Sequence, residues 1–340
     1  MLYKTTRDDN DTYTAHRVLH ENRASDGGVF IPFRMPLFSE KEIAELVSVG
    51  FGETVAAILN KFFSCHLTGW DVDFCIGRNA IKLDTMSHRM VVAELWHNPE
   101  GKYGHICSSL YNKICATVSE PVTEWFRIAA HISVQFGIYS EICRNGIINV
   151  GDSIDITTFA HDLSVPIAAV YARQMGLPIG TIILSCEENG DLWDMIHLGE
   201  VAVSVYNMDP NGVERLVHAT MGIDMVKDLL DAMIVNKTFR VPEDQHSDFQ
   251  DGLFCSVVGK DRGVQNVNSM YRSNSYLLDT TTAITVAGLQ DYRAKTGESH
   301  MTLVLYCTSP QHSLDCISGA TGIPQDKLSV LLKNALDGRQ

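Results

Sequence analysis

The stretch Pro166–Ser185 reads PIAAVYARQMGLPIGTIILS and decides the fold class of this chain. Its first half, Pro166–Met175, has the apolar spacing of a helix. Gly176 is a typical residue to follow a helix, because glycine adopts the left-handed conformation there at little cost. The last five residues, Thr181–Ser185, form a largely apolar run of strand length. A helix that leads through a short turn into such a strand is typical of a buried parallel sheet covered by helices.

The same alternation of strands and helices extends in both directions from this stretch. Strands are predicted at Val91–Leu95, Ile147–Val150 and Thr302–Cys307, and helices at Ile106–Val118, Thr123–Cys143, Thr282–Lys295 and from Pro324 onward. Short strands that alternate with helices predict an α/β fold, with a mostly parallel sheet and helices on both of its faces.

The first ninety residues have a different pattern. Ser39 and Glu42 have the spacing of a capping box, which predicts the start of a helix, and a second helix is predicted over Val55–Phe63. We therefore expect an N-terminal segment over residues 1–90 and an α/β core over residues 91–340, packed together as one compact unit.

The charge of the chain excludes several classes of partner. Its 340 residues include 27 Lys and Arg against 41 Asp and Glu, which gives a formal net charge of −14. Proteins that bind nucleic acids or anionic membranes use Lys and Arg to neutralise phosphates, so we expect neither as a partner. The most apolar window, Val165–Leu184, contains Arg173, Gln174 and two prolines. We therefore expect no membrane span.

The cysteines and histidines do not form a recognisable motif. The nine cysteines include no C-x-x-C pair, and most of them lie in apolar runs typical of buried, reduced thiols. No apolar stretch follows Met1–Arg7 to act as a signal peptide, so we expect a reduced protein in the cytoplasm. His88, His97 and His105 lack the i,i+4 spacing of helix-borne ligands, so no metal site is predicted.

Two loops follow predicted strands and are candidate sites. Gly101–Gly104 lies between a strand and a helix, where a phosphate can meet a helix N-terminus, although a connecting loop is the simpler interpretation. Glu187–Asp191 follows the strand at 181–185, at the edge of the sheet where α/β proteins bind ligands, although a solvated turn is the simpler interpretation. The residues alone define no catalytic set.

Several segments, in the same order along the chain, resemble motifs of one enzyme family. They are Met1–Arg7 with Ala24–Pro32, Glu94–Pro99, Trp125 and Arg127, Tyr171–Ile179, Glu188–Asp191 with Leu198–Glu200, Met208–Asp209 with Val213–Leu216, and Tyr276–Asp279 with Thr282–Ala283. Glu94–Pro99, for example, is similar to the motif E-L-F-H-G-P. The family is threonine synthase, a pyridoxal-phosphate (PLP) enzyme of the tryptophan-synthase-β fold. The resemblance implies that fold, with residues 1–90 as a threonine-synthase-like N-terminal segment.

The resemblance also implies where the Schiff-base lysine of the family would lie. Counted from Pro99, the lysine of E-L-F-H-G-P-T-L-A-F-K-D falls on Gly104, which has no amine to bind the PLP aldehyde. Lys102 lies two residues earlier, a displacement of about 6–7 Å along an extended chain. Lys102 is therefore only a weak candidate for a relocated catalytic lysine.

Three further departures affect the cofactor site that the resemblance implies. Residues 159–166 replace a glycine-rich phosphate loop without a glycine, and Asp162 would repel a phosphate there. Between Asn112 and Trp125 the chain lacks the family's S-G-D-T-G-S-A-A segment, so we expect the smaller domain of the fold to be largely deleted. Cys307 takes the place of a hydroxyl beside the cofactor pyridine nitrogen, and a thiol is a weaker hydrogen-bond partner.

These departures predict a degenerate threonine synthase-like protein that has lost PLP-dependent catalysis, so that no cofactor is expected, and that retains a small-molecule or protein-binding role. The remnant pocket is predicted at His97, Asp162 and Cys307, with Asn189 and Asp191 as candidate ligand-binding residues. One alternative is an active enzyme on a phosphohydroxy amino acid with a rearranged site. Another is a regulatory or structural subunit. Apolar surface exposed by loss of a domain predicts a homo-oligomer, and the family resemblance implies a homodimer.

Overall fold

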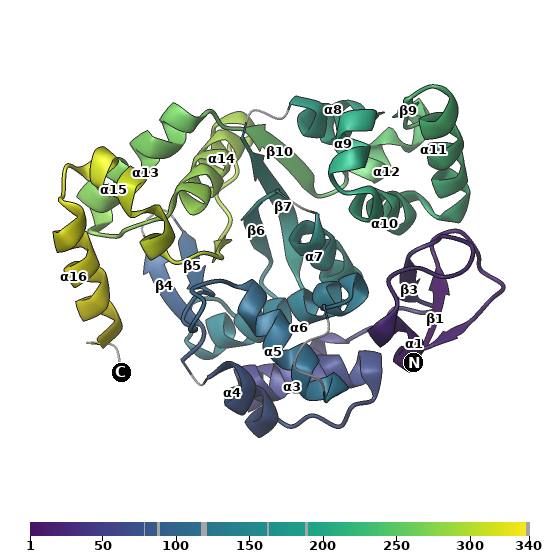
Figure 1. Cartoon of the computed structure of the whole chain (residues 1–340), viewed down its shortest axis with the longest axis horizontal. Helices are drawn as coiled ribbons and strands as arrows, with labels where there is room; N and C mark the ends of the chain where they lie inside the picture. The colour runs from purple at the N-terminus through teal and green to yellow at the C-terminus, as the bar shows by residue number, and fades with distance from the viewer. Residues whose placement is uncertain (78, 87–88, 117–120, 162, 188–189, 338–340) are drawn as a thin grey trace.

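The computed structural model describes residues 1–340 except 78, 87–88, 117–120, 162, 188–189 and 338–340 (Figure 1). Its centre is a six-stranded sheet in the order β10-β7-β6-β11-β5-β4. The strands are β4 (Lys82–Met86), β5 (Met90–Glu94), β6 (Ile154–Phe159), β7 (Ile179–Cys186), β10 (Leu253–Val257) and β11 (Thr302–Tyr306). Neighbouring strands run parallel except β4, which is antiparallel to β5. The predicted α/β fold with a mostly parallel sheet is confirmed.

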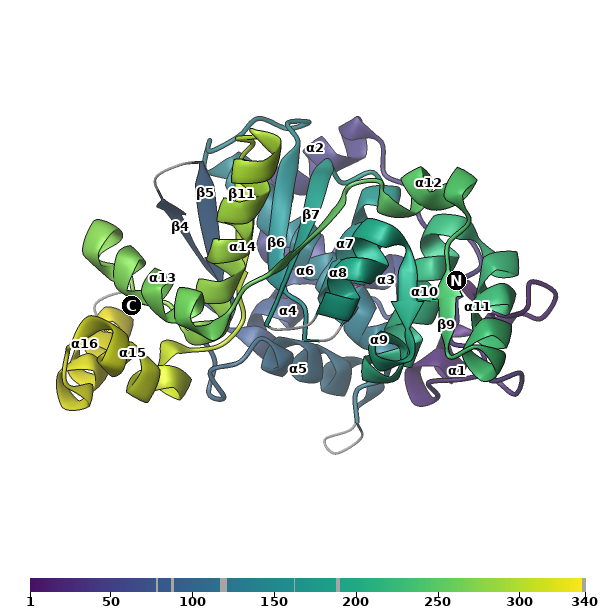
Figure 2. The same ribbon diagram turned by 90° about the horizontal axis from the view of Figure 1, so that it is seen from above.

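Helices cover both faces of this sheet (Figure 2). On one face α7 (Ser164–Gln174) contacts β6 and β7, and the long helix α6 (Glu124–Arg144) packs between α7 and α3 (Phe51–Phe63). On the other face α14 (Thr280–Thr296) contacts β6, β7, β10 and β11, with α13 (Lys260–Asn274) beside it. Alternate residues of the strands therefore face two apolar clusters, one on each side of the sheet.

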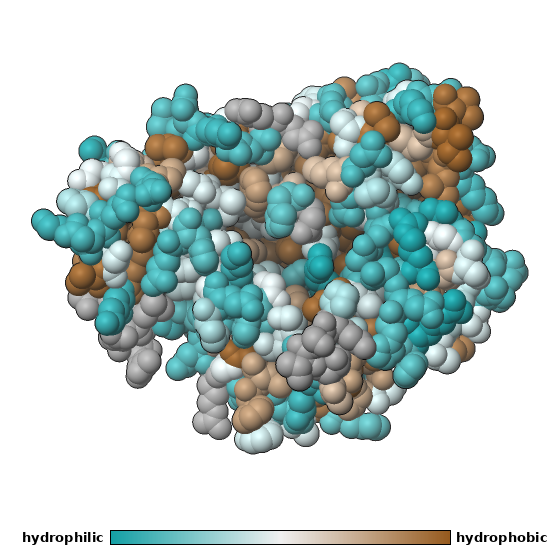
Figure 3. Space-filling model, in the orientation of Figure 1, coloured by the Kyte–Doolittle hydropathy of each residue, from teal (hydrophilic) through white to brown (hydrophobic). Residues whose placement is uncertain are grey.

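The surface of the molecule is not uniformly polar (Figure 3). The face shown there is hollowed near its centre, with apolar atoms visible inside the depression. Apolar atoms also gather at one edge, over α11 (Ile223–Val235). At the end of this helix Ile234 is 72% exposed and Val235 is 76% exposed.

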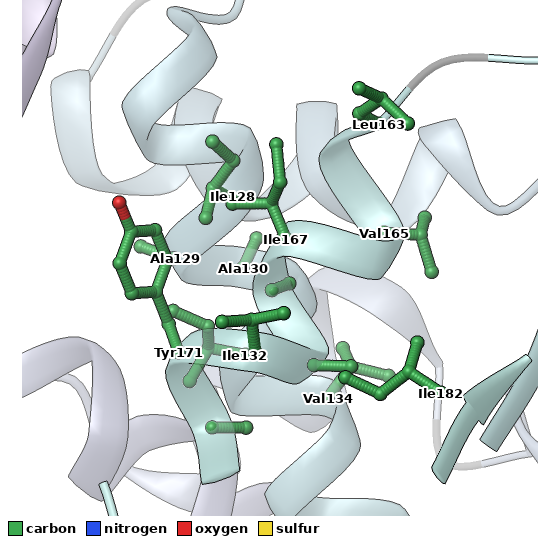
Figure 4. Close-up of a cluster of buried hydrophobic side chains, with 14 of the residues drawn as sticks. Ile128, Ala129, Ala130, Ile132, Val134, Leu163, Val165, Ile167, Tyr171 and Ile182 are labelled. Atoms are coloured by element: carbon green, nitrogen blue, oxygen red, sulfur yellow. The ribbon is translucent and has the colours of Figure 1, made fainter. Parts of the chain in front are cut away.

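Helix α6 is apolar on nearly all sides because it lies between two layers of helices. Figure 4 shows side chains of α6, including Ile128 and Ile132, in one buried cluster with Ile167 and Tyr171 of α7. On its other side Gly137 lies so close to α3 that an added Cβ would be 2.6 Å from the ring of Phe51. Glycine at this position therefore permits the close packing of the two helices.

The N-terminal residues form a small sheet and a group of helices. The elements are β1 (Leu2–Thr5), β2 (Tyr13–Thr14), α1 (Ala15–His20), β3 (Phe30–Pro32), α2 (Glu40–Val49) and α4 (Gly69–Ile76), with α3 between the last two. The predicted capping box is confirmed, since the Ser39 side chain accepts the Glu42 backbone N–H and Glu42 accepts that of Ser39. Tyr3 attaches the sheet to the core, because its hydroxyl donates to the Phe62 carbonyl at 2.9 Å and its ring packs 6.0 Å from that of Trp125.

The remaining elements connect and flank the central strands. They are α5 (Gly104–Cys115), α8 (Gly190–Leu198), β8 (Glu200–Ala202), α9 (Val203–Met208), α10 (Pro210–Met221), β9 (Thr238–Arg240), η1 (Glu243–Gln245), α12 (His246–Gln250), η2 (Pro310–Ser313), α15 (Leu314–Thr321) and α16 (Gln325–Asp337). Helix α5 ends at Cys115 and helix α6 begins at Glu124, so the link between them comprises eight residues, 116–123. Among the described residues, no helix combines the length and hydropathy that a bilayer crossing requires.

The predicted strand at Ile147–Val150 is wrong, and the strand of this region begins at Ile154. The backbone and side-chain N–H groups of Asn149 both donate to the Asp152 carboxylate, at 2.8 and 3.0 Å, and Gly151 has a φ of +90°. This local turn satisfies backbone groups that a strand would otherwise pair. The other predicted elements are present, with their ends displaced by a few residues.

Candidate functional site

The carboxyl ends of β5 and β11 meet at the point where the order of the sheet reverses. Strand β11 lies between β5 and β6 in the sheet although it follows both along the chain. The connection from β5 to β6 contains α6, whereas the connection from β10 to β11 contains α14, so the two connections cover opposite faces of the sheet. In α/β proteins ligands bind in the crevice outside the strand ends at such a point. A pocket of about 560 Å³ lies there, lined by residues 96–101 after β5 and by Ser309, Gln311 and His312 after β11.

Backbone hydrogen bonds hold the two loops of this pocket together. The Tyr103 N–H donates to the Cys307 carbonyl at 2.8 Å, and the Ser309 N–H donates to the Gly101 carbonyl at 2.8 Å. The structure therefore brings the loop that carries Lys102 beside the loop that carries Cys307. Two segments of the predicted remnant pocket, about 200 residues apart in sequence, are neighbours.

His97 belongs to a buried polar network behind this pocket. Its Nε2 atom lies 2.5 Å from Oε2 of Glu94, and Oε1 of Glu94 accepts the Tyr276 hydroxyl at 2.5 Å. Burial and the adjacent Glu94 carboxylate raise the pKa of Tyr276, which keeps its hydroxyl protonated as a donor. The indole of Trp96 stacks on His97 with 4.1 Å between ring centroids. The network fixes the imidazole at the wall of the pocket.

Lys102 and Gly104 decide whether the site fits the covalent cofactor that the resemblance implies. Gly104 is the first residue of α5, is exposed, and would offer an added Cβ open space on all sides. Lys102 lies on an exposed part of the loop, where its backbone N–H donates to the Asn98 side chain at 3.3 Å. Position 104 therefore has open space around an added Cβ but carries no amine. The residues present do not fit a PLP Schiff base at this position.

The start of α7 is the other end of the cofactor site that the resemblance implies. The N–H of Leu163, the residue before α7, donates to Oδ2 of Asp209 at 3.0 Å, and Oδ1 of Asp209 accepts the Gly212 N–H at 2.8 Å. One internal carboxylate thus caps the starts of α7 and α10. A donor that a cofactor phosphate would need is already satisfied by an anion of the chain itself. The predicted residue Asp162 lies outside the described residues.

A buried arginine lies next to this helix start. Arg215 of α10 is 2% exposed, and its Nη1 donates to Oε2 of Glu124 at 3.1 Å. Within the described part of the chain, its Nε and Nη2 atoms have no hydrogen-bond partner. Arg215 lines a pocket of about 160 Å³ together with Arg127, Ser164 and Asp209. Arg215 therefore contributes a buried cation to the pocket lining, and two of its donors have no partner in the described structure.

The other predicted site residues have local roles. Cys307 is half-buried, and its thiol lies 3.7 Å from the Leu305 carbonyl. Asp191 lies in the first turn of α8, where its carboxylate accepts the Ser204 hydroxyl. Asn189 lies outside the described residues. Asp191 therefore belongs to a different region of the molecule from the loops after β5 and β11.

The sequence pattern did not identify Glu94, Tyr276 and Arg215 as site residues. Glu94 was quoted only as part of a predicted strand and of the matching motif Glu94–Pro99, and Tyr276 and Arg215 only as members of other matching segments. One signal was available for Arg215, because Glu214 and Arg215 interrupt the apolar face of a helix. Charged residues at such positions are buried only when they are paired or serve a site.

Comparison with known proteins gives three related results. Residues 2–79 match the family model described as threonine synthase N terminus. The chain is 22% identical over 173 residues to threonine synthase-like 1 of Homo sapiens and of Pongo abelii. These alignments cover 47% of this chain and 23% of each relative, so the chain spans less than a quarter of the length of the curated relatives it matches.

Solved structures of threonine synthases have the same fold. PLP-bound threonine synthase from Brucella melitensis superposes with a TM-score of 0.78 at 16% identity, covering 95% of this chain and 92% of that one. Yeast threonine synthase superposes with a TM-score of 0.78 at 15% identity, and the match covers 99% of this chain and 98% of that one. Threonine synthase from Escherichia coli superposes with a TM-score of 0.70 at 13% identity, and the match covers 95% of this chain and 93% of that one. Residues 2–79 therefore match the threonine synthase N-terminal family model, and the chain has the fold of the solved threonine synthases.

Proposed function

We propose that this chain forms no Schiff base with PLP and instead binds a small oxoanion, such as the phosphate group of a metabolite, beside the start of α7. Gly104 supports the first part, because it has no amine at the position that corresponds to the family's lysine. Asp209 supports it as well, since its carboxylate already occupies the Leu163 N–H at 3.0 Å. A bound phosphate at that donor would face a negative charge of the chain itself.

The binding role rests on the two unpartnered nitrogens of Arg215. A buried guanidinium with unused N–H groups is costly, because it has lost water without gaining an acceptor. Nε and Nη2 lie on one edge of the guanidinium, the geometry that binds two oxygens of one phosphate or carboxylate. An oxoanion in the adjacent pocket of about 160 Å³ would satisfy both donors.

Two carboxylates and two guanidiniums line this pocket, and both carboxylates already accept hydrogen bonds from donors of the chain. The Glu124 carboxylate accepts from Arg215 at 3.1 Å and from the Asn211 amide at 2.5 and 2.6 Å. The Asp209 carboxylate accepts two backbone N–H groups. Arg127 lies on the same pocket and is exposed, so a second cation is available at its opening. The start of α7 adds a favourable helix dipole. The pocket volume suits a group of a few heavy atoms rather than a whole cofactor.

Isothermal titration calorimetry with inorganic phosphate tests this proposal. We expect phosphate to bind the wild-type protein, and the exposed substitution Arg127→Ala to weaken it about tenfold, as the loss of one charge-assisted contact does. Arg215→Lys should weaken it further, because lysine keeps the charge but loses the two-pronged edge. Arg34→Ala, an exposed arginine in the N-terminal segment, is the matched control and should leave binding unchanged. Absence of phosphate binding, or equal binding by all four proteins, would overturn the binding role.

The alternatives from the sequence remain separate proposals with their own readouts. A rearranged enzyme would use Lys102 to capture PLP or would act without a covalent link. A stable adduct at Lys102 with turnover of a phosphohydroxy amino acid would favour the Lys102 version. A homodimer would use exposed apolar surface such as the end of α11, where Ile234 and Val235 are exposed. Sedimentation velocity of the purified chain measures that state directly.

A further inference from the structure

An aromatic cluster lies at the opposite edge of the sheet from β4. Helix α8 and helix α14 both contact the edge strand β10 (Figure 1). Trp193 and His197 of α8 and Phe254 of β10 pack in a row, with ring centroids 4.6 Å apart for Trp193 and His197 and 5.1 Å apart for His197 and Phe254. The outer two rings line a pocket of about 630 Å³. This pocket shares no lining residue with the pocket of Arg215.

The chain places one of its own ammonium groups over these rings. Nζ of Lys295, in the last turn of α14, lies 5.8 Å from the centroid of Trp193 and 5.5 Å from that of Phe254. Both distances are within the range of a cation–π contact. Lys295 is exposed, so its ammonium loses little interaction free energy when it leaves the rings and is hydrated by water. The rings thus form a cation site whose present occupant is readily displaced.

Carboxylates complete the wall of this pocket. Asp291 accepts the Ser256 hydroxyl at 2.6 Å and pairs with Arg262 at 2.5 Å, so its charge is compensated. Asp194 also lines the pocket, and no ion-pair partner for it occurs in the described part of the chain. An unpaired carboxylate beside two aromatic faces attracts an organic cation more strongly than a neutral molecule.

We propose that this pocket binds an alkylammonium ligand, whose cationic head displaces Lys295 from Trp193 and Phe254 and lies beside Asp194. The aromatic faces favour an organic ammonium over a compact, strongly hydrated metal ion. The pocket is larger than a single trimethylammonium group, so the ligand carries its ammonium on a longer chain. The site is independent of the oxoanion pocket, and each proposal stands or fails without the other.

Titration calorimetry with choline and with its neutral isostere 3,3-dimethylbutan-1-ol tests this inference, because the two probes differ mainly in charge. We expect choline to bind the wild-type protein about tenfold more tightly than the isostere. Lys295→Met removes the competing ammonium and should tighten choline about threefold while leaving the isostere unchanged. Asp194→Asn, a substitution of a partly exposed carboxylate, should weaken choline alone. Equal binding of the two probes, or weaker choline binding by Lys295→Met, would overturn the proposal.

A tryptophan substitution gives a second, independent readout. Trp193→Ala should lower choline affinity at least tenfold, whereas Trp70→Ala should not change it. Trp70 is the matched control because it is 62% exposed and lies on α4, outside the lining of this pocket. Circular dichroism spectra of both variants establish that they fold. Unchanged choline binding by a folded Trp193→Ala would exclude the aromatic cation site.

Discussion

The Asp209 carboxylate accepts the Leu163 backbone N–H at 3.0 Å, across 46 residues of sequence, and so caps α7 from the residue that precedes α10. Because the same side chain also accepts the Gly212 N–H, Asp209→Ala removes two cap hydrogen bonds. We expect it to lower the free energy of unfolding by about 1–2 kcal/mol. Urea denaturation followed by circular dichroism measures this loss.

The control for this cap is an exposed aspartate in the first turn of another helix. Asp224 of α11 has a side chain that is 93% exposed, so Asp224→Ala should change stability by less than about 0.5 kcal/mol. A loss of equal size in the two variants would contradict a capping role for Asp209.

Tyr276 donates to the buried Glu94 carboxylate, and removal of this donor should be costly. Tyr276→Phe keeps the ring but removes one hydrogen-bond donor from Glu94, a residue that is 3% exposed. We expect a loss of about 1–3 kcal/mol. Tyr13→Phe is the matched control, because Tyr13 is also buried but no hydroxyl hydrogen bond is found for it in the described structure, and it should cost less than about 0.5 kcal/mol.

Histidine 218 makes stability depend on pH. Burial, with a smaller contribution from Lys4, lowers the pKa of His218 from 6.5 to about 4. Between pH 6.5 and pH 4 the unfolded chain binds a proton at His218 that the folded chain does not. The contribution of neutral His218 to the free energy of unfolding is therefore fully present above pH 6.5 and is lost as the pH falls towards 4. The loss is about 1 kcal/mol per pH unit in this interval. Urea denaturation at pH 7, 6 and 5 should show this slope, and His218→Gln should reduce it; an unchanged slope in the variant would contradict the assignment.

We expect the substitution of glycine by alanine to have different effects on stability at Gly137 and at Gly104. Gly137→Ala places a methyl group 2.6 Å from Phe51 and should cost about 1–3 kcal/mol through overpacking of α3 and α6. Gly104→Ala places it in open space and should change stability by less than about 0.5 kcal/mol. Differential scanning fluorimetry of the two variants compares them directly. A large loss for Gly104→Ala would mean that position 104 is not open enough to accept a lysine.

The fold was largely predictable because its deciding elements have strong local signals. The junction at Gly176, with a φ of +101°, ends α7 and lies against the Phe38 carbonyl, so glycine is required both by conformation and by space. Strand β6 was missed because half of its residues are polar but buried, namely Asp155, Thr157 and Thr158. Such residues hide the apolar run that marks a central strand.

Only those parts of the candidate site that are formed by residues close together in the chain could be predicted from the sequence. The residue count from Pro99 along the matching motif placed the family's lysine at Gly104, which has no amine. The pairs that build the rest lie far apart in the chain, 91 residues for Arg215 and Glu124 and 182 residues for Tyr276 and Glu94. No local pattern reports such pairs, because they form only when helices from distant segments pack together.

The central claim is that this chain, although it has the fold of threonine synthases, does not hold PLP through a lysine. The direct measurement is incubation with PLP, reduction with borohydride and peptide mass mapping of the modified lysines, with the exposed Lys41 as the reference for non-specific labelling. We predict that Lys102 is labelled no more than Lys41, while Gly104→Lys gains a label at position 104. A stoichiometric pyridoxyl adduct at Lys102 of the wild-type chain, with a visible absorbance band before reduction, would contradict the account.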